Sequence, residues 1–101
     1  MNKASELLVT VYIPTRNRLD LLTRAVNSVL SQTYKNIELI IVDDCSTDQR
    51  VAVYLNDLMA RGRIKVMLLL EQSGACVARN KAIDLAQGFY ITGLDDDDYF
   101  E

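Results

Sequence analysis

The 101-residue sequence contains no histidine and no tryptophan, and only one proline, four glycines and two cysteines. The absence of histidine excludes Ser-His triads, histidine general bases and histidine metal ligands. Cys45 and Cys76 form no CxxC pair, so a zinc site is not expected. No apolar run reaches the roughly 18 residues of a membrane span, and the first residues lack a signal-peptide core. We therefore expect a cytoplasmic protein.

The net charge is also small, at −3, because 11 Lys and Arg residues nearly balance 14 Asp and Glu residues. The acidic excess comes largely from one run, Asp95–Asp98. No basic stripe with interleaved aromatic residues is present, so no nucleic-acid partner is expected. The composition, 50% hydrophobic and 25% charged, is typical of a single globular domain, which we assign to residues 1–101.

Strand-like and helix-like segments alternate along the chain. Four apolar, β-branched segments are predicted to be strands: Leu7–Ile13, Ile37–Val42, Ile64–Leu70 and Phe89–Leu94. Pro14 is expected to end the first of them. The second is apolar on both faces apart from Glu38, which is typical of a strand covered by helices on both sides.

The three intervening segments carry helix signals. Asn17 is a candidate cap for a helix that runs to about Gln32, and Ser46 with Gln49 forms a capping-box pattern for the second helix. Gly62 and Gly88 are predicted to end the second and third helices. The order β-α-β-α-β-α-β predicts an α/β fold of the Rossmann-like, three-layer α/β/α type, with a mainly parallel sheet.

Polar clusters follow three of the predicted strands, at the edge where open parallel sheets bind ligands. They are Pro14–Asn17, Asp43–Ser46 and Asp95–Asp98. Four adjacent carboxylates repel one another unless a cation or donors compensate them, and hard oxygen ligands suit Mg²⁺ or Mn²⁺. On an extended segment Asp95 and Asp97 point the same way and are able to share a metal. A solvated acidic loop or helix start is the alternative.

The other two clusters supply donors and acceptors. Ser46 and Asp48 compete to cap the second helix, so one carboxylate of Asp43-Asp44 is available to a ligand, as an acceptor for a base N–H or a ribose hydroxyl. The candidate phosphate contacts are Arg16, Arg18 and Arg79. Neither a P-loop nor a GxGxxG fingerprint is present.

Five segments in this order resemble family 2 glycosyltransferases of the GT-A fold. They are Val9–Arg18, Ser28–Tyr34, Glu38–Asp48, Gly74–Ala82 and Gly88–Asp98. The resemblance extends from Leu8 to Glu101. It implies transfer of a sugar from a nucleotide-diphosphate sugar to an acceptor hydroxyl, usually with inversion, in polysaccharide or glycoconjugate synthesis.

The resemblance also implies site residues by position. Pro14, Thr15 and Asn17 would line the nucleotide pocket, and Asp44 would accept a hydrogen bond from the base, with Asp43 beside it. Asp96 would lie near the ribose and the sugar. Asp97 would ligate a divalent metal, Mn²⁺ or Mg²⁺, with Asp95 completing a DxD motif. Four successive Asp residues permit two registers of that motif, Asp95/Asp97 or Asp96/Asp98. Arg79 joins the expected nucleotide-sugar residues as a phosphate contact.

The remaining expectations concern the whole protein. The family's general base lies beyond the position of Glu101, so we expect this chain to be the donor-binding part of a truncated catalytic domain, inactive alone. A UDP-sugar is the favoured donor, and a sugar or lipid-linked glycan is the acceptor. Peripheral attachment to the inner face of the membrane and a homodimer are further expectations. The alternatives are a non-catalytic nucleotide-sugar binder and a Mg²⁺-binding receiver-like signalling domain, whose acidic pair would follow the first strand.

Overall fold

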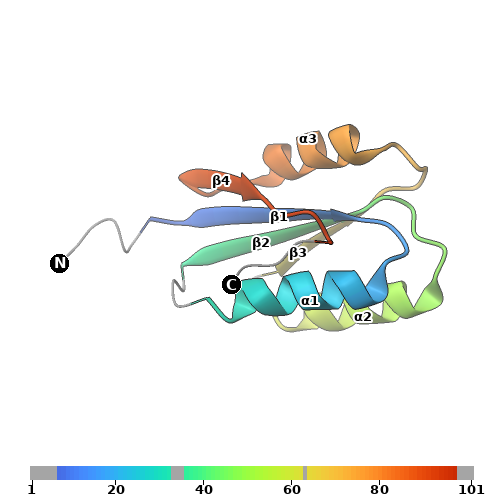
Figure 1. Cartoon of the computed structure of the whole chain (residues 1–101). Coiled ribbons are helices and arrows are strands. Elements are labelled where there is room, and N and C mark those ends of the chain that lie inside the picture. The colour runs from blue at the N-terminus through green and yellow to red at the C-terminus, as the bar shows by residue number, and fades with distance from the viewer. Residues whose placement is uncertain (1–6, 33–35, 63, 98–101) are drawn as a thin grey trace.

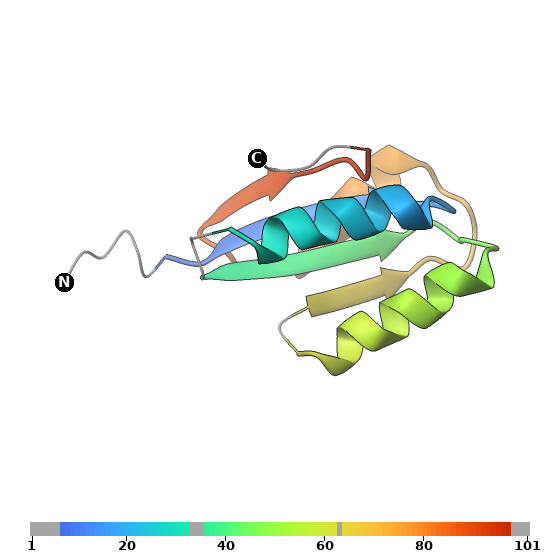
Figure 2. The ribbon, with the colours of Figure 1, turned by 60° about the horizontal axis from the view of Figure 1, so that its bottom comes forward.

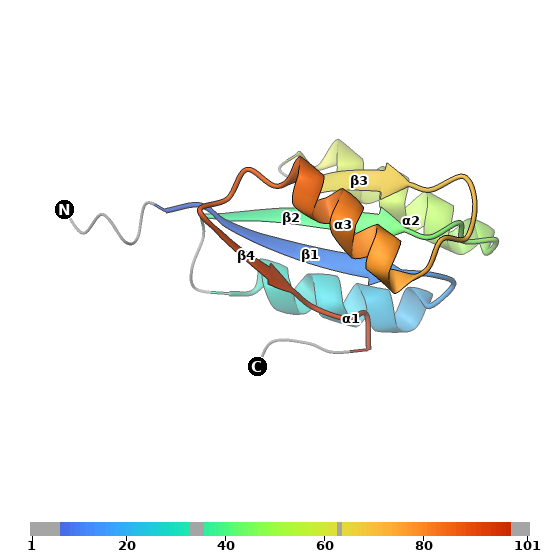
Figure 3. The same cartoon turned by 90° about the horizontal axis from the view of Figure 1, so that it is seen from above.

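A computed structural model of the chain describes residues 7–32, 36–62 and 64–97. Its elements alternate as predicted, and they are β1 (Val9–Thr15), α1 (Leu19–Leu30), β2 (Ile37–Asp43), α2 (Gln49–Ala60), β3 (Ile64–Leu68), α3 (Ala75–Leu85) and β4 (Tyr90–Gly93). The four strands form one parallel sheet in the order β3-β2-β1-β4. Helices α1 and α2 cover one face, and α3 covers the other (Figure 1 and Figure 3). The prediction of a three-layer α/β/α fold with a parallel sheet is therefore confirmed.

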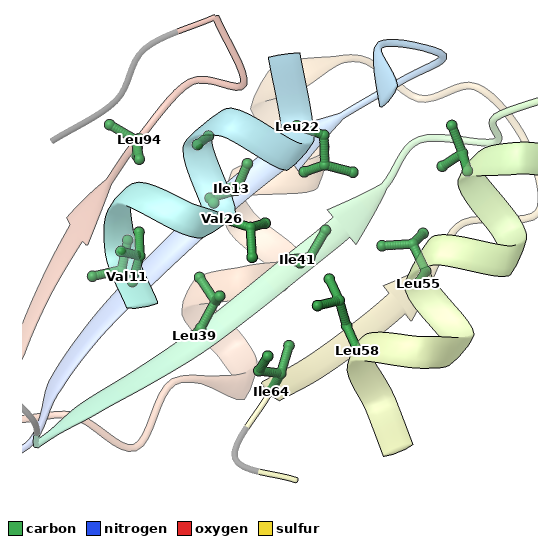
Figure 4. Close-up of a cluster of buried hydrophobic side chains, with 13 residues drawn as sticks. Val11, Ile13, Leu22, Val26, Leu39, Ile41, Leu55, Leu58, Ile64 and Leu94 are labelled. Atoms are coloured by element: carbon green, nitrogen blue, oxygen red, sulfur yellow. The ribbon is translucent and has the colours of Figure 1, made fainter. Parts of the chain in front are cut away.

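The centre of the sheet is buried on both faces, because successive side chains of a strand point to opposite sides. Leu39 and Ile41 of β2 face α1 and α2, where they pack in the larger core (Figure 4). Ile40 and Val42 face the other way and pack against alanines of α3. These side chains are fully buried or nearly so, so the apolar character of β2 on both faces has the predicted cause.

The helices of the larger core present apolar stripes at helical spacing. Helices α1 and α2 lie over the same face of the sheet (Figure 2). Leu22 and Val26 of α1 and Leu55 and Leu58 of α2 pack in the core between these helices and the sheet (Figure 4). The residues of α3 that face the sheet are alanines, so this helix packs closely on the face opposite to α1 and α2. None of the described helices is long and apolar enough to cross a membrane.

The strands end at different heights along the sheet. The β1–β2 register pairs Thr15 with Asp43 at the carboxyl end, whereas the last β1–β4 pair is Tyr12 with Gly93. The residues that follow β4 therefore lie beside the last residues of β1 and not beyond its end. At the open side of β4, all four strand residues are exposed. The expected homodimer, which an exposed strand edge permits, stays a prediction.

Several predicted boundaries were wrong for identifiable reasons. Pro14 does not end β1 but pairs with Val42 inside it. The cap of α1 is Arg18 without a side-chain bond, because the Asn17 side chain bonds elsewhere. The cap of α2 is Asp48, whose carboxylate accepts the Arg50 N–H.

Further differences lie in the second half of the chain, where β4 is one residue shorter at each end than predicted. β3 ends at Leu68, two residues before the predicted end. The helix before Gly88 ends at Leu85 with Ala86 as its cap. Gly88 has a packing role instead, because a β-carbon on it would lie 2.6 Å from the backbone nitrogen of Thr10.

A buried carboxylate ties the α3–β4 loop to the sheet. Glu38 Oε1 accepts hydrogen bonds from the Thr10 hydroxyl and the Gln87 N–H, each at 2.8 Å. Glu38 Oε2 lies 2.7 Å from the ammonium of Lys65, and the Thr10 hydroxyl accepts the Gly88 N–H at 2.9 Å. Burial alone raises the pKa of Glu38, but the bonds from Gln87, Lys65 and Thr10 outweigh it, so the pKa lies below its usual value.

We expect Gly88→Ala to destabilise the chain by about 3 kcal/mol, because the added methyl meets the β1 backbone. The matched control is Gly62→Ala, where a β-carbon meets nothing within 4 Å and only the positive φ costs about 1 kcal/mol. Urea unfolding of both variants measures the difference. Equal losses would contradict the close packing of Gly88 on β1.

We expect Glu38→Gln to cost about 2 kcal/mol near neutral pH, because the charged acceptor is lost. The lowered pKa of Glu38 means that its contribution is complete above the unfolded pKa of about 4.3 and is lost as the pH falls through the folded pKa. The stability gap between wild type and variant should therefore close below about pH 4. Urea titrations across this range test the gap. The exposed Glu71→Gln should show no comparable gap, and a constant gap for Glu38→Gln would refute the assignment.

Candidate functional site

A cavity of about 520 Å³ lies at the carboxyl ends of the strands, where ligands bind in open α/β sheets. The segments after β1, β2, β3 and β4 and the first turns of α3 enclose it. Its lining residues are Pro14, Thr15, Arg16, Arg18, Asp44, Gln72, Gly74, Ala78, Asp95, Asp96 and Asp97. All three predicted polar clusters, the ones after β1, β2 and β4, thus contribute residues to this one cavity.

Asp96 lines the cavity and is held against β1 by two contacts, so its predicted place near the ribose and the sugar stays a prediction. Its Oδ2 accepts the Thr15 hydroxyl at 2.9 Å, and its Oδ1 lies 3.3 Å from Nη1 of Arg18. The side chain of Asp96 is 8% exposed, whereas that of Arg18 is 55% exposed. The guanidinium of Arg24 also donates to the carbonyl of Asp97 at 2.8 Å. These contacts fix the acidic turn to β1 and α1.

Asp95 and Asp97 are the exposed carboxylates of this turn, and both line the cavity. Asp96 and Asp97 form a turn and not the extended segment that the spacing argument assumed. The choice of the Asp95/Asp97 register over the Asp96/Asp98 register stays a prediction, and Asp98 lies outside the described residues. No group of three or more Asp, Glu or Cys side chains in the described ranges is arranged to hold a metal. Two carboxylates nevertheless fit Mg²⁺ or Mn²⁺, which takes its other ligands from water and phosphate oxygens.

Asp44 forms the opposite side of the cavity. Its carboxylate is buried and accepts the N–H groups of Ser73 at 2.6 Å and Gly74 at 2.8 Å. These donors precede α3, so the carboxylate also lies where the helix dipole favours negative charge. Gly74 has φ +90°, which a side chain rarely adopts. Each carboxylate oxygen retains a lone pair for a ligand donor.

Asp43 shapes the turn beside the cavity but does not line it. Its carboxylate accepts the Ser46 N–H at 3.2 Å and the Ser46 hydroxyl. Between the two, Cys45 has φ +60°, in the left-handed region that is uncommon for residues other than glycine. Asp43 thereby stabilises a strained turn.

Two further predicted binding residues also lie outside the lining. Asn17 bonds to the β2–α2 turn through Thr47 and Asp48. Arg79 is exposed, and its guanidinium lies 3.9 Å from the sulfur of Cys76. The binding roles predicted for Asn17, Asp43 and Arg79 stay predictions, whereas Pro14, Thr15, Asp44, Asp95, Asp96 and Asp97 all reach the cavity.

Sequence reasoning missed Gln72, Gly74 and Ala78 as lining residues. Their position after the third strand carried the signal, since that strand ends at the same edge of the sheet. Arg16 is the other notable lining residue. Its Nε is buried without a hydrogen-bond partner among the described residues, whereas the nearby Arg18 is paired with Asp96. Arg16 is therefore a cation of the cavity that a ligand acceptor would satisfy.

The fold and the cavity together define an α/β protein with a ligand site at the carboxyl edge of a parallel sheet. The sequence model described as "Glycosyl transferase family 2" matches residues 10–101. The chain therefore belongs to glycosyl transferase family 2. Membership in this family leaves no basis for the receiver-like alternative.

Relatives and solved structures agree with this membership. The chain is 53% identical over 95 residues to WcaA of Escherichia coli, which is named for colanic acid biosynthesis, and the match covers 90% of this chain and 33% of WcaA. The chain thus spans about a third of that relative.

Solved structures carry the same fold. A structure of residues 1–349 of S. aureus TarS in complex with UDP superposes with a TM-score of 0.81 at 32% identity, over 92% of this chain and 28% of that TarS chain. The mannosyltransferase PcManGT of Pyrobaculum calidifontis, in complex with GDP-Man and Mn²⁺, superposes with a TM-score of 0.78 at 26% identity. This match covers 92% of the present chain and 28% of the PcManGT chain. These neighbours are GT-A glycosyltransferases, so the predicted GT-A fold is confirmed. One of these neighbours, PcManGT, therefore holds a divalent metal.

We expect Asp44→Asn to destabilise the chain by about 2 kcal/mol, because the amide NH₂ must face one of the two backbone N–H donors. Hydrogen exchange at the Ser73 and Gly74 amides should become faster, and urea unfolding should shift to lower concentration. Asp84→Asn, an exposed change on α3, should leave both amides unchanged. Unaltered exchange in Asp44→Asn would show that the carboxylate does not hold this loop.

Proposed function

We propose that this chain is the donor-binding part of a glycosyltransferase. The whole protein would transfer a sugar from a nucleotide-diphosphate sugar to an acceptor hydroxyl, with inversion. The observation that carries the proposal is the cavity itself, with one acceptor carboxylate, Asp44, on the β2 side and two exposed carboxylates, Asp95 and Asp97, on the β4 side. Strand β1 lies between them, so one ligand is able to meet both.

The chemistry of the two sides suits the two ends of a nucleotide-diphosphate sugar. Asp44 would accept a hydrogen bond from the base, while Pro14 and Thr15 line the floor of the cavity beside it. The guanidinium of Arg16, whose Nε has no hydrogen-bond partner among the described residues, would bind an oxygen of the diphosphate. Base and phosphate would then be held at fixed points, which positions the anomeric carbon for attack.

Asp95 and Asp97 would hold the divalent metal, Mn²⁺ or Mg²⁺, together with the diphosphate oxygens. When bound, the metal supplies Lewis-acid neutralisation of the charge on the leaving diphosphate. The protein's own contribution is to keep these two carboxylates at the cavity by fixing Asp96 with Thr15 and Arg18. Without that contact, repulsion among the carboxylates would open the turn.

The acceptor and the setting of the reaction complete the proposal. A UDP-sugar is the proposed donor, in line with the UDP complex of TarS. A sugar or a lipid-linked glycan is the proposed acceptor, and a polysaccharide or glycoconjugate is the product. The transfer step needs a base to take the proton of the acceptor, and we assign that role to no described residue. The cytoplasmic location and attachment to the inner face of the membrane stay predictions.

Calorimetric titration of the 101-residue chain with UDP, GDP, CDP and dTDP tests donor binding. Each nucleotide is added with Mn²⁺, with Mg²⁺ and with EDTA. We expect one diphosphate to bind only with metal, and Asp97→Asn to weaken that binding at least about tenfold, because a metal ligand is lost. Asp84→Asn changes the net charge equally and should bind as wild type. A folded chain that binds no diphosphate, or binds it equally in EDTA, would refute the metal-dependent donor site.

A further inference from the structure

Asn17 lies between two residues of the cavity without lining it. Arg16 and Arg18 both line the cavity, and Asn17 does not. Its backbone has φ +54°, in the left-handed region where asparagine is more common than most other residues. This conformation turns the Asn17 side chain away from its neighbours, toward the turn after β2.

Both the oxygen and the nitrogen of the Asn17 side-chain amide form hydrogen bonds with the β2–α2 turn. Its Oδ1 accepts the N–H groups of Thr47 at 2.8 Å and Asp48 at 2.9 Å, and its Nδ2 donates to the Thr47 hydroxyl at 3.1 Å. The backbone N–H of Asn17 donates to the Ser46 hydroxyl at 2.9 Å, which in turn donates to Asp43. Every polar group of Asn17 except its carbonyl thus binds a residue about thirty positions away in the chain.

We propose that Asn17 is a positioning residue that joins the β1–α1 turn to the β2–α2 turn and makes no contact with the ligand. The first turn carries Arg16 and Arg18, and the second begins with Asp44. The junction fixes the separation between the base side and the phosphate side of the cavity. The inference rests on the proposed function, since that function requires both sides to grip one nucleotide.

Asparagine suits this junction for two physical reasons. It tolerates the positive φ at lower cost than most side chains, and its amide supplies an acceptor and a donor on one short side chain. Asp48 caps α2, and the Thr47 and Asp48 amides just before the helix have no partner within it. Asn17 Oδ1 satisfies both amides from the neighbouring turn.

The test compares two substitutions in the 101-residue chain. Asn17→Gly removes the side chain but keeps the positive φ accessible, so the backbone is not strained. Asn17→Asp keeps the acceptor, and the Thr47 hydroxyl is able to reverse its bond and donate to the carboxylate. Exposed Asn27 of α1 supplies the control Asn27→Gly, which lowers helix stability without touching either turn. The readouts are hydrogen exchange at the Thr47 and Asp48 amides and the Kd for the nucleoside diphosphate with Mg²⁺.

We expect Asn17→Gly to speed exchange at both amides and to raise Kd about tenfold, and Asn17→Asp to restore the protection of both amides toward wild type. Asn27→Gly should change neither. Wild-type Kd in Asn17→Gly despite faster exchange would overturn the positioning role. If the wild-type chain binds no nucleoside diphosphate, the proposed function is refuted, and the expected effect on Kd is refuted with it. That outcome differs from wild-type Kd in Asn17→Gly, which refutes the positioning role alone.

Discussion

The parallel pairing of β1 with β2 over seven residues is the constraint on which the rest of the structure depends. It places Thr15 beside Asp43, and the Asp44 N–H then donates to the Thr15 carbonyl at 2.9 Å. Because β4 also runs parallel to β1, its carboxyl end faces the same edge. Three polar turns that are distant in sequence therefore converge on one cavity, and the helices on both faces are what keep this pairing buried.

The carboxylates at this edge of the sheet fall into a buried group and an exposed group, and the two groups have different roles. Asp43, Asp44 and Asp96 are buried, and each is compensated by hydroxyl, amide or guanidinium donors of the protein. They hold the turns in place. Asp95 and Asp97 are exposed and have no such compensation from the described residues, so a cation is the group that would offset their repulsion. The fold thus gives Asp96 a different environment from its neighbours Asp95 and Asp97.

The elements and their order were predictable because they follow from local pattern. The apolar run of β2 and the alternation of strands and helices each imply a parallel sheet without further information. The turns were not predictable in the same way. Asn17 and Ser46 have good capping chemistry, but partners 29 to 31 residues away take their side chains. Likewise Asp44 reaches the cavity while Asp43 does not, a difference that depends on the loop after β3.

The most direct test of the central claim is paramagnetic broadening of the backbone amide NMR spectrum by Mn²⁺ in the presence of UDP. The account predicts that broadening centres on Asp95 and Asp97 and extends to Thr15 and Gly74 across the cavity. Amides near Glu38 and Lys65, at the opposite ends of the strands, should stay sharp. Broadening centred on Glu38, or spread evenly over exposed acids such as Asp57, would contradict a metal–nucleotide site at the carboxyl edge of the sheet.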